Sequence, residues 1–265
     1  MGTGGGSAGG GSSGEGADVV FGRVVEIVYD GASEAYNENG KSNSINGIVY
    51  RPLNAGRNNE DILKLKFAYC GDPTYRRVPL KGEIIRAEGL PSEEGRESDS
   101  NSKKYYWTDT IPLWNHPHHN AYPDVVADPS SAAAPDLGDE FEEQEATGPL
   151  QTFPGDVIIE GRHGNTLRFG GTKYDSNIFT DGSNNGKPYT ILSNGQDNPG
   201  SGTDLIVEDI DKDPASMYLG SDHKFKLTQA NTKRDAFSSA PKEANSYKGS
   251  QVIINSGRLF FNSKE

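Results

Sequence analysis

The chain has 265 residues, of which only 32% are hydrophobic, together with 33 glycines and 15 prolines. Such a composition excludes one large helical core and favours thin β modules with many turns. The formal net charge of −12 disfavours nucleic acid as the main partner, because phosphate binding needs a basic surface. One cysteine, Cys70, excludes an intrachain disulfide. No apolar run approaches the roughly 18 residues that a membrane helix needs.

The first segment, residues 1–17, consists mostly of glycine and serine, and Glu15 is its one charged side chain. Such a segment buries too little apolar surface to offset the entropy lost on ordering. We therefore expect a flexible arm over residues 1–17.

Residues 18–121 contain five segments whose β-branched or alternating composition predicts strands. These segments are Val19–Tyr29, Ser44–Pro52, Ile62–Tyr69, Leu80–Glu88 and Lys103–Thr108. Five strands in about 90 residues favour a small barrel of the oligomer-binding (OB) type, with a β-sandwich as the alternative. Gly22, inside the first segment, predicts a bulge or bend. No part of the chain has a convincing helical pattern.

Residues 122–150 carry eight carboxylates and no lysine or arginine, which predicts an extended acidic linker. Residues 151–265 form a second β region, which we expect to build a stem. Its predicted strands are Val157–Arg162, Leu167–Gly170, Tyr189–Gly195, Met217–Leu219, Phe225–Leu227 and a hairpin-like run over Gln251–Ser263. The last run is an apolar edge, which we expect either other chains to cover or a longer natural chain to continue. The fold class is therefore all-β.

A histidine-rich segment follows the predicted barrel. His116 and His118 have the spacing that places two imidazoles on one face of a strand, where they could bind Zn, Fe or Ni. Three copies of this pair around an axis could complete an octahedral site. No cysteine or carboxylate lies within four residues, so the alternative is that these rings stack and hydrogen-bond where the chain leaves the barrel. No other cofactor is predicted.

Candidate interface residues lie at two places. Arg162 and Arg168 flank a turn at His163, and their guanidinium groups could bind acidic residues of a neighbouring chain bidentately. Trp114 and His119, near the end of the predicted barrel, are the other residues that we expect at an interface.

Catalytic patterns are weak. Glu160 is the one carboxylate in a predicted strand that suggests a general acid, and there is no Gly-x-Ser-x-Gly nucleophile elbow. We therefore expect a protein that is not an enzyme. Two alternatives stay open: a glycan hydrolase that uses Glu160 or a loop acid, and a polysaccharide-binding module. The aromatic residues for such a module are Tyr105, Tyr106, Trp107 and Trp114.

Several segments taken together resemble the central spike proteins of contractile-tailed phages, above all the T4-like group that includes cyanobacterial phages. In the first half these segments are Arg76–Ile85, Lys104–Trp107 and Leu113–Pro123. In the second half they are Gly161–Gly170, Ile191–Gln196, Glu208–Asp213 and Met217–Leu219. The similarity covers residues 18–265 except the acidic linker.

The resemblance implies a virion protein of the tail baseplate with an OB barrel. It implies a homotrimer on the tail axis that contacts the hub ring and the tail tube, plugs the tube and helps to pierce the host envelope. Some members carry a lysozyme domain after the barrel, and residues 122–150 are too few for one. Others continue into a long intertwined β-helix. This chain ends where such repeats would begin, so we expect the spike tip to be missing, truncated or supplied by a separate protein.

Overall fold

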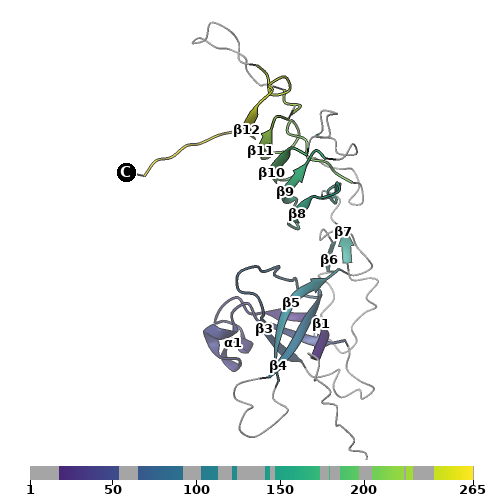
Figure 1. The fold of residues 1–265 in the computed structure, drawn as a ribbon. Helices are drawn as coiled ribbons and strands as arrows, with labels where there is room; N and C mark the ends of the chain where they lie inside the picture. Colours follow the sequence, from purple (N-terminus) through teal and green to yellow (C-terminus); the bar gives the residue numbers. More distant parts are fainter. Residues whose placement is uncertain are drawn as a thin grey trace, which may run out of the picture. The chain divides into compact units, whose positions relative to one another are not determined.

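In the computed structural model, the chain divides into two compact units, a closed barrel and an open five-stranded sheet (Figure 1). The structure describes residues 18–53, 65–91, 103–112, 121–123, 141–143, 147–173, 179, 186–196, 205–223, 225–228 and 242–264. These residues are nearly all strand, turn or irregular chain, so the prediction of an all-β protein is confirmed. The predicted arm over residues 1–17 lies outside the described residues.

The barrel consists of five strands. They are β1 (Asp18–Ile27), β2 (Ile48–Pro52), β3 (Lys66–Cys70), β4 (Ile84–Pro91) and β5 (Lys103–Ile111). The strand order is β1-β2-β3-β5-β4, and β4 pairs with β1 to close the barrel. All neighbours are antiparallel except β3 and β5, which are parallel. Each of the five predicted strands is therefore present, with shifted ends.

The barrel core is built from inward-facing side chains of all five strands. Its buried members are Val24, Ile27, Ile48, Tyr50, Ala68, Ile85, Ala87 and Trp107. Trp107 is 2% exposed, and its indole Nε1 donates a hydrogen bond of 2.8 Å to the carbonyl oxygen of Asn46. A buried indole with a satisfied N–H stabilises the core. The expectation that Trp107 grips a polysaccharide is therefore wrong.

Gly22 has a different role from the one that the sequence suggests. The register of β1 against β2 shifts between Val24 and Glu26, while Gly22 pairs regularly with Pro52. The ring of Tyr50 lies over Gly22, so that a Cβ at this position would meet the Cδ2 atom of Tyr50 at 2.1 Å. Gly22 thus allows the buried Tyr50 ring to pack against the strand, and the bulge lies further along β1.

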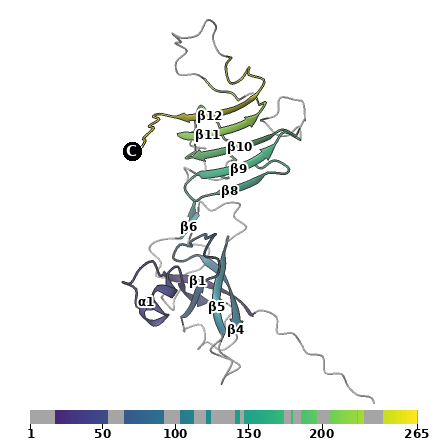
Figure 2. The same ribbon diagram turned by 60° about the vertical axis from the view of Figure 1, so that its left-hand side comes forward.

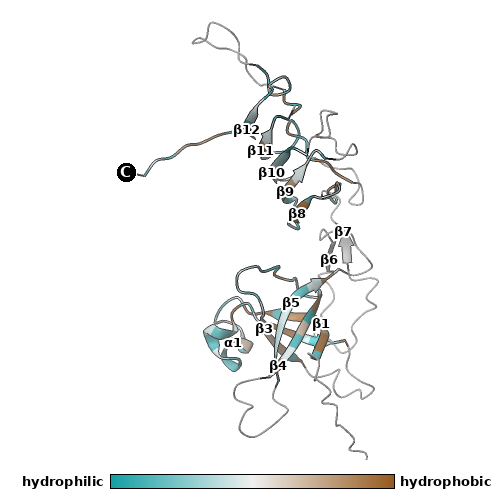
Figure 3. Cartoon of the chain, viewed as in Figure 1, coloured by the Kyte–Doolittle hydropathy of each residue, from teal (hydrophilic) through white to brown (hydrophobic). Residues whose placement is uncertain are grey.

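Two short helical segments lie between β1 and β2, where no helix was predicted. They are α1 (Glu34–Glu38) and the 3₁₀ turn η1 (Lys41–Ser44). Neither is long enough to show a helical repeat in the sequence. In Figure 3 α1 is coloured mainly as hydrophilic, in contrast with the hydrophobic β1. The predicted second strand begins later than expected because Lys41–Ser44 is helical.

The second unit is an antiparallel sheet in which each strand pairs with the next one along the chain (Figure 2). Its strands are β8 (Val157–Glu160), β9 (Asn165–Gly171), β10 (Pro188–Asn194), β11 (Ala215–Ser221) and β12 (Ser250–Ser256). The strand predicted over Phe225–Leu227 is absent, and these residues are irregular. The predicted final hairpin is also wrong, because only β12 pairs, and residues 257–264 run away from the sheet (Figure 1).

The region predicted as a linker contains regular structure at its two ends. The strands β6 (Ala121–Pro123) and β7 (Phe141–Glu143) pair with each other. Residues 147–150 are buried, and Leu150 forms a parallel bridge to Ile206. The second unit therefore begins before residue 151. Residues 124–140 and 144–146 lie outside the described part of the chain.

The packing of Tyr50 on Gly22 predicts that Gly22→Ala destabilises the barrel. The added methyl group would overlap the buried ring, and overpacking of this kind costs about 1–3 kcal/mol. Urea denaturation followed by tryptophan fluorescence checks this, because Trp107 lies in the same core. Gly31→Ala is the control: its Cβ would lie 3.4 Å from Tyr36, an ordinary contact. Equal stability of the two variants would contradict the argument.

Candidate functional site

The sheet from β8 to β12 presents two faces, and residues of the same chain cover one of them. On this inner face the strand register aligns one residue from each strand: Ile158, Arg168, Ile191, Tyr218 and Ile253. Ile191 and Tyr218 are buried beneath Ile210 and Phe225, which come from irregular segments after β10 and β11. The inner face is thus the core of the second unit.

A fully buried arginine lies in this inner row. The Nε atom of Arg168 donates a hydrogen bond of 2.7 Å to Glu208, and its Nη1 atom donates one of 2.5 Å to Asp156. Its Nη2 atom donates to the carbonyl oxygen of Gln151 at 2.8 Å. The ring of Phe153 lies 5.6 Å from the guanidinium carbon. Arg168 therefore fastens the segment before β8 and the loop before β11 onto the sheet.

The cluster holds one guanidinium group between two carboxylates. Burial would lower the pKa of Arg168, but the hydrogen bonds and charges of Glu208 and Asp156 outweigh it and raise the pKa. Arg168 and both carboxylate side chains are almost completely buried. A buried charge that loses its partner costs several kcal/mol, so each of the three groups depends on the others.

A second buried carboxyl group, that of Asp213, lies on the same side of the sheet. It is 7% exposed and accepts a hydrogen bond of 3.2 Å from the hydroxyl group of Tyr218. Burial raises the pKa of Asp213 to about 6, against the lowering effect of its hydrogen bonds. This carboxyl group therefore titrates under mildly acidic conditions.

The outer face of the sheet is apolar in two complete rows. The first row runs Val157, Phe169, Thr190, Leu219 and Val252, and the second runs Ile159, Leu167, Leu192, Met217 and Ile254. Nine of these ten residues are apolar and none is charged. We call these ten residues the outer rows.

The outer rows are exposed to a degree that is unusual for apolar side chains. Val252 is 62% exposed, Val157 59% and Leu192 49%, and four others are at least 40% exposed. Beside them on the same face lies a polar or small row: Asn165, Asn194, Ala215 and Ser256. An apolar centre with a polar rim is the usual composition of a protein–protein interface.

The residues predicted at an interface differ in where the structure places them. All three nitrogen atoms of the Arg168 guanidinium contact partners in its own chain, so the expectation that Arg168 binds acids of a neighbouring chain is wrong. Arg162 and His163 lie in the turn between β8 and β9, half-buried and exposed respectively. Trp114 and His119 lie outside the described residues, as do the predicted metal ligands His116 and His118, and these stay predictions.

Glu160 has a structural contact. Its Oε1 atom accepts a hydrogen bond of 3.0 Å from the backbone N–H of Leu150. The residue is exposed, but neighbouring atoms desolvate its carboxyl group and raise its pKa, against the effects of the Leu150 bond and of Arg168. Glu160 thus holds the segment before β8 to the edge of the sheet, a contact that explains a carboxylate here without catalysis.

The sequence contains a pattern that indicates the outer rows. The strand predictions relied on alternation of apolar and polar residues and did not use it. Val157-Ile158-Ile159, Met217-Tyr218-Leu219 and Val252-Ile253-Ile254 are continuous apolar runs. A strand with one solvated face alternates, whereas a strand covered on both faces is continuously apolar. These runs therefore indicate two buried faces.

Neither a family model, a curated protein nor a solved structure matches this chain. Within the described ranges, no three His, Cys, Asp or Glu side chains gather as a metal site. No helix in that part of the chain is long and apolar enough to cross a membrane. The geometry of the outer rows is accordingly the main observation that bears on function.

The buried cluster predicts that Arg168→Met lowers the free energy of unfolding of the second unit by about 3–5 kcal/mol, because Asp156 and Glu208 would stay buried without a cation. Thermal and urea denaturation followed by circular dichroism measure the loss. Arg162→Met, six residues earlier and half-buried, is the matched control and should lose less than about 1 kcal/mol. A similar loss in both variants would contradict the assigned role of Arg168.

The raised pKa of Asp213 predicts a specific pH dependence. An unfolded Asp has a pKa of about 3.9, so between about pH 4 and pH 6 the folded state binds more protons. The contribution of Asp213 to the free energy of unfolding therefore decreases as the pH rises through this window. The free energy of unfolding of Asp213→Asn minus that of the natural chain should therefore increase from pH 4 to pH 7. Urea denaturation at each pH measures this difference. Asp211→Asn, an exposed neighbour, should show a smaller change; no difference between them would refute the assignment.

Proposed function

We propose that this chain is a structural subunit of the central spike of a contractile phage tail baseplate and acts as a homotrimer. The observation that carries the proposal is the pair of outer rows, which the described residues of one chain leave exposed. In this role the sheet of each copy packs on identical copies to form the stem, and the barrel contacts the hub ring and tail tube. The segment similarities to spike proteins motivate the choice of assembly.

The barrel topology supports this proposal. A five-stranded barrel with the order β1-β2-β3-β5-β4 and a parallel β3–β5 contact is consistent with an OB fold, a five-stranded Greek-key barrel. The spike proteins that the chain resembles begin with a barrel of this kind. The order of the two units along the chain, barrel first and sheet second, also agrees with the resemblance.

The size of the exposed apolar surface supports self-association. Seven side chains of the outer rows are 40–62% exposed, which corresponds to on the order of 600 Å² of apolar surface, at the upper limit for a typical monomer. Burial of that surface would contribute on the order of 15 kcal/mol per chain, against an association cost of roughly 4–15 kcal/mol. An interface of this size is compatible with a stable oligomer.

The lack of charge in the outer rows permits identical copies as the partners. Each copy carries a net charge of −12, which opposes self-association. The outer rows contain no charged residue, and burial of such a surface leaves no ion without a partner. A basic partner protein would find no acidic group there to bind. The outer rows thus fit a second copy better than an oppositely charged protein.

The proposal predicts that Leu192→Glu converts a trimer into a monomer. Leu192 lies in β10, the middle strand of the sheet, and a buried carboxylate in the contact would be unpaired. Light scattering coupled to size-exclusion chromatography, with native mass spectrometry, measures the mass. The control is Asn194→Glu in the polar row of the same strand, which should stay trimeric.

Two results would overturn the proposal. The first is a natural chain that is monomeric at micromolar concentration with a cooperative unfolding transition, because the outer rows would then need no cover. The second is an assembly whose mass is insensitive to Leu192→Glu while circular dichroism shows an intact sheet, because the subunits would then associate through another surface.

A further inference from the structure

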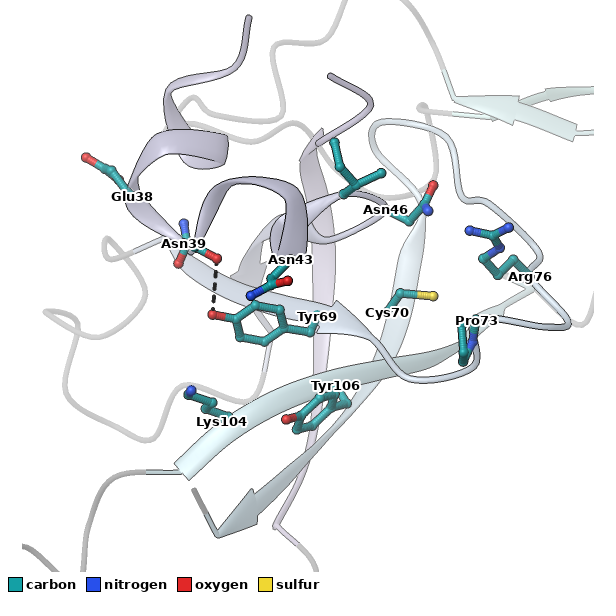
Figure 4. A pocket seen from close by; sticks show the side chains of 12 residues that line it. Glu38, Asn39, Asn43, Asn46, Tyr69, Cys70, Pro73, Arg76, Lys104 and Tyr106 are labelled. Carbon is teal, nitrogen blue, oxygen red and sulfur yellow. Dashed lines mark hydrogen bonds between the residues drawn. The ribbon is translucent and has the colours of Figure 1, made fainter. Parts of the chain in front are cut away.

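The barrel has a pocket of about 670 Å³ on its outer surface (Figure 4). Three walls form it: the segment from the end of α1 through η1, strand β3 with the turn that follows it, and strand β5. The residues used below are Glu38, Asn43, Tyr69, Arg76, Lys104 and Tyr106. Its volume lies within the range of small-molecule sites, but its lining is polar and aromatic. A polar ligand with a flat apolar face therefore fits this pocket.

Two tyrosines form an aromatic platform in the pocket. Tyr69 and Tyr106 are direct partners in the short parallel ladder between β3 and β5, so both side chains leave the barrel on the same side. Their ring centroids are 5.8 Å apart, and the rings are tilted by 38°. Figure 4 shows both side chains beside the pocket. Tyrosine offers an apolar ring face together with a polar hydroxyl group.

Neighbouring groups hold the platform in place. The hydroxyl group of Tyr69 donates a hydrogen bond of 3.3 Å to the carbonyl oxygen of Asn39. On its other side the ring of Phe67 contacts Tyr69 edge-on, with centroids 4.9 Å apart. The orientation of Tyr69 is therefore fixed before a ligand arrives, which lowers the entropic cost of binding.

Two of the side chains that line the pocket are cationic, in a strongly acidic chain. Arg76 and Lys104 line it together with one carboxylate, Glu38, and the nearby carboxylate of Asp72 interacts electrostatically with Arg76. The guanidinium group of Arg76 is suited to bidentate binding of a carboxylate. Asn43, an exposed amide in η1, adds a hydrogen-bond donor and acceptor of the kind that hydroxyl groups need. The charge of the lining selects an anionic ligand.

We propose that this pocket binds an acidic oligosaccharide. A sugar ring stacks on Tyr106, its hydroxyl groups bond to Asn43 and the tyrosine hydroxyls, and its carboxylate pairs with Arg76. The stacked base and phosphate of a single-stranded nucleic acid share part of this chemistry. The net charge of −12 repels a polyanionic backbone outside the pocket, so a short ligand with isolated negative charges fits better. This site does not depend on the trimer proposed above.

The test uses the full chain on an array of acidic and neutral oligosaccharides, followed by calorimetry with the strongest acidic binder. We expect binding of acidic members only, and a loss of about tenfold or more in affinity, equivalent to ~1.4 kcal/mol, for Tyr106→Ala and for Arg76→Gln. Tyr106→Phe keeps the ring and should retain most of the affinity. Tyr75→Ala is the control, since Tyr75 is 59% exposed and lies outside the pocket lining.

Arg76 is exposed, so Arg76→Gln stays informative if Tyr106→Ala fails to fold. Four outcomes overturn the proposal: no binding on the array, equal binding of neutral and acidic members, binding that Arg76→Gln leaves unchanged, and stronger binding of a thymidine oligonucleotide than of any glycan. A monomeric mass with intact glycan binding would overturn the proposed spike function and leave this site standing.

Discussion

A β-sheet has two faces, and within the described part of the chain only the inner face of the sheet from β8 to β12 is covered by other segments. The loops that carry Phe153, Ile210 and Phe225 lie over the inner face. The outer rows expose leucine, isoleucine, valine and phenylalanine side chains on all five strands. Exposure of so much apolar surface to water is unfavourable in free energy, and a partner that covers the outer rows removes this cost. The proposed assembly follows from this constraint.

The same constraint explains why charges occur on the inner face. In a sheet with apolar residues on both sides, a slip of one residue in strand register would exchange one apolar face for the other at little cost. Arg168 removes this ambiguity, because only the observed register places its guanidinium group between Asp156 and Glu208. The buried ion pairs thus specify the pairing of β9, even where a well-packed apolar cluster would be as stable. The outer rows are then free to be almost entirely apolar.

The sequence predicted local structure well and long-range partners poorly. Composition and β-branched runs located the five barrel strands and the five strands of the sheet, since these depend on neighbouring residues. The carboxylate partners of Arg168 lie 12 and 40 residues away in sequence. No local pattern connects them to Arg168, so the sequence was equally compatible with carboxylates of a neighbouring chain. Trp107 was misjudged for a related reason: its burial depends on the closure of the barrel, which brings Asn46 within hydrogen-bond distance. The sequence did not predict helix α1, because five residues are too few to show a helical repeat.

The two units differ in what their surfaces can bind. The outer rows contain one hydroxyl group and no charge, so contact with them depends on apolar burial. The barrel pocket carries Arg76, Lys104 and two tyrosine hydroxyls, so its contacts are directional and weaken as salt screens them. Because these residue sets do not overlap, substitutions in one need not alter the other. A chain with this division can hold permanent partners through its sheet while its barrel exchanges short-lived ones.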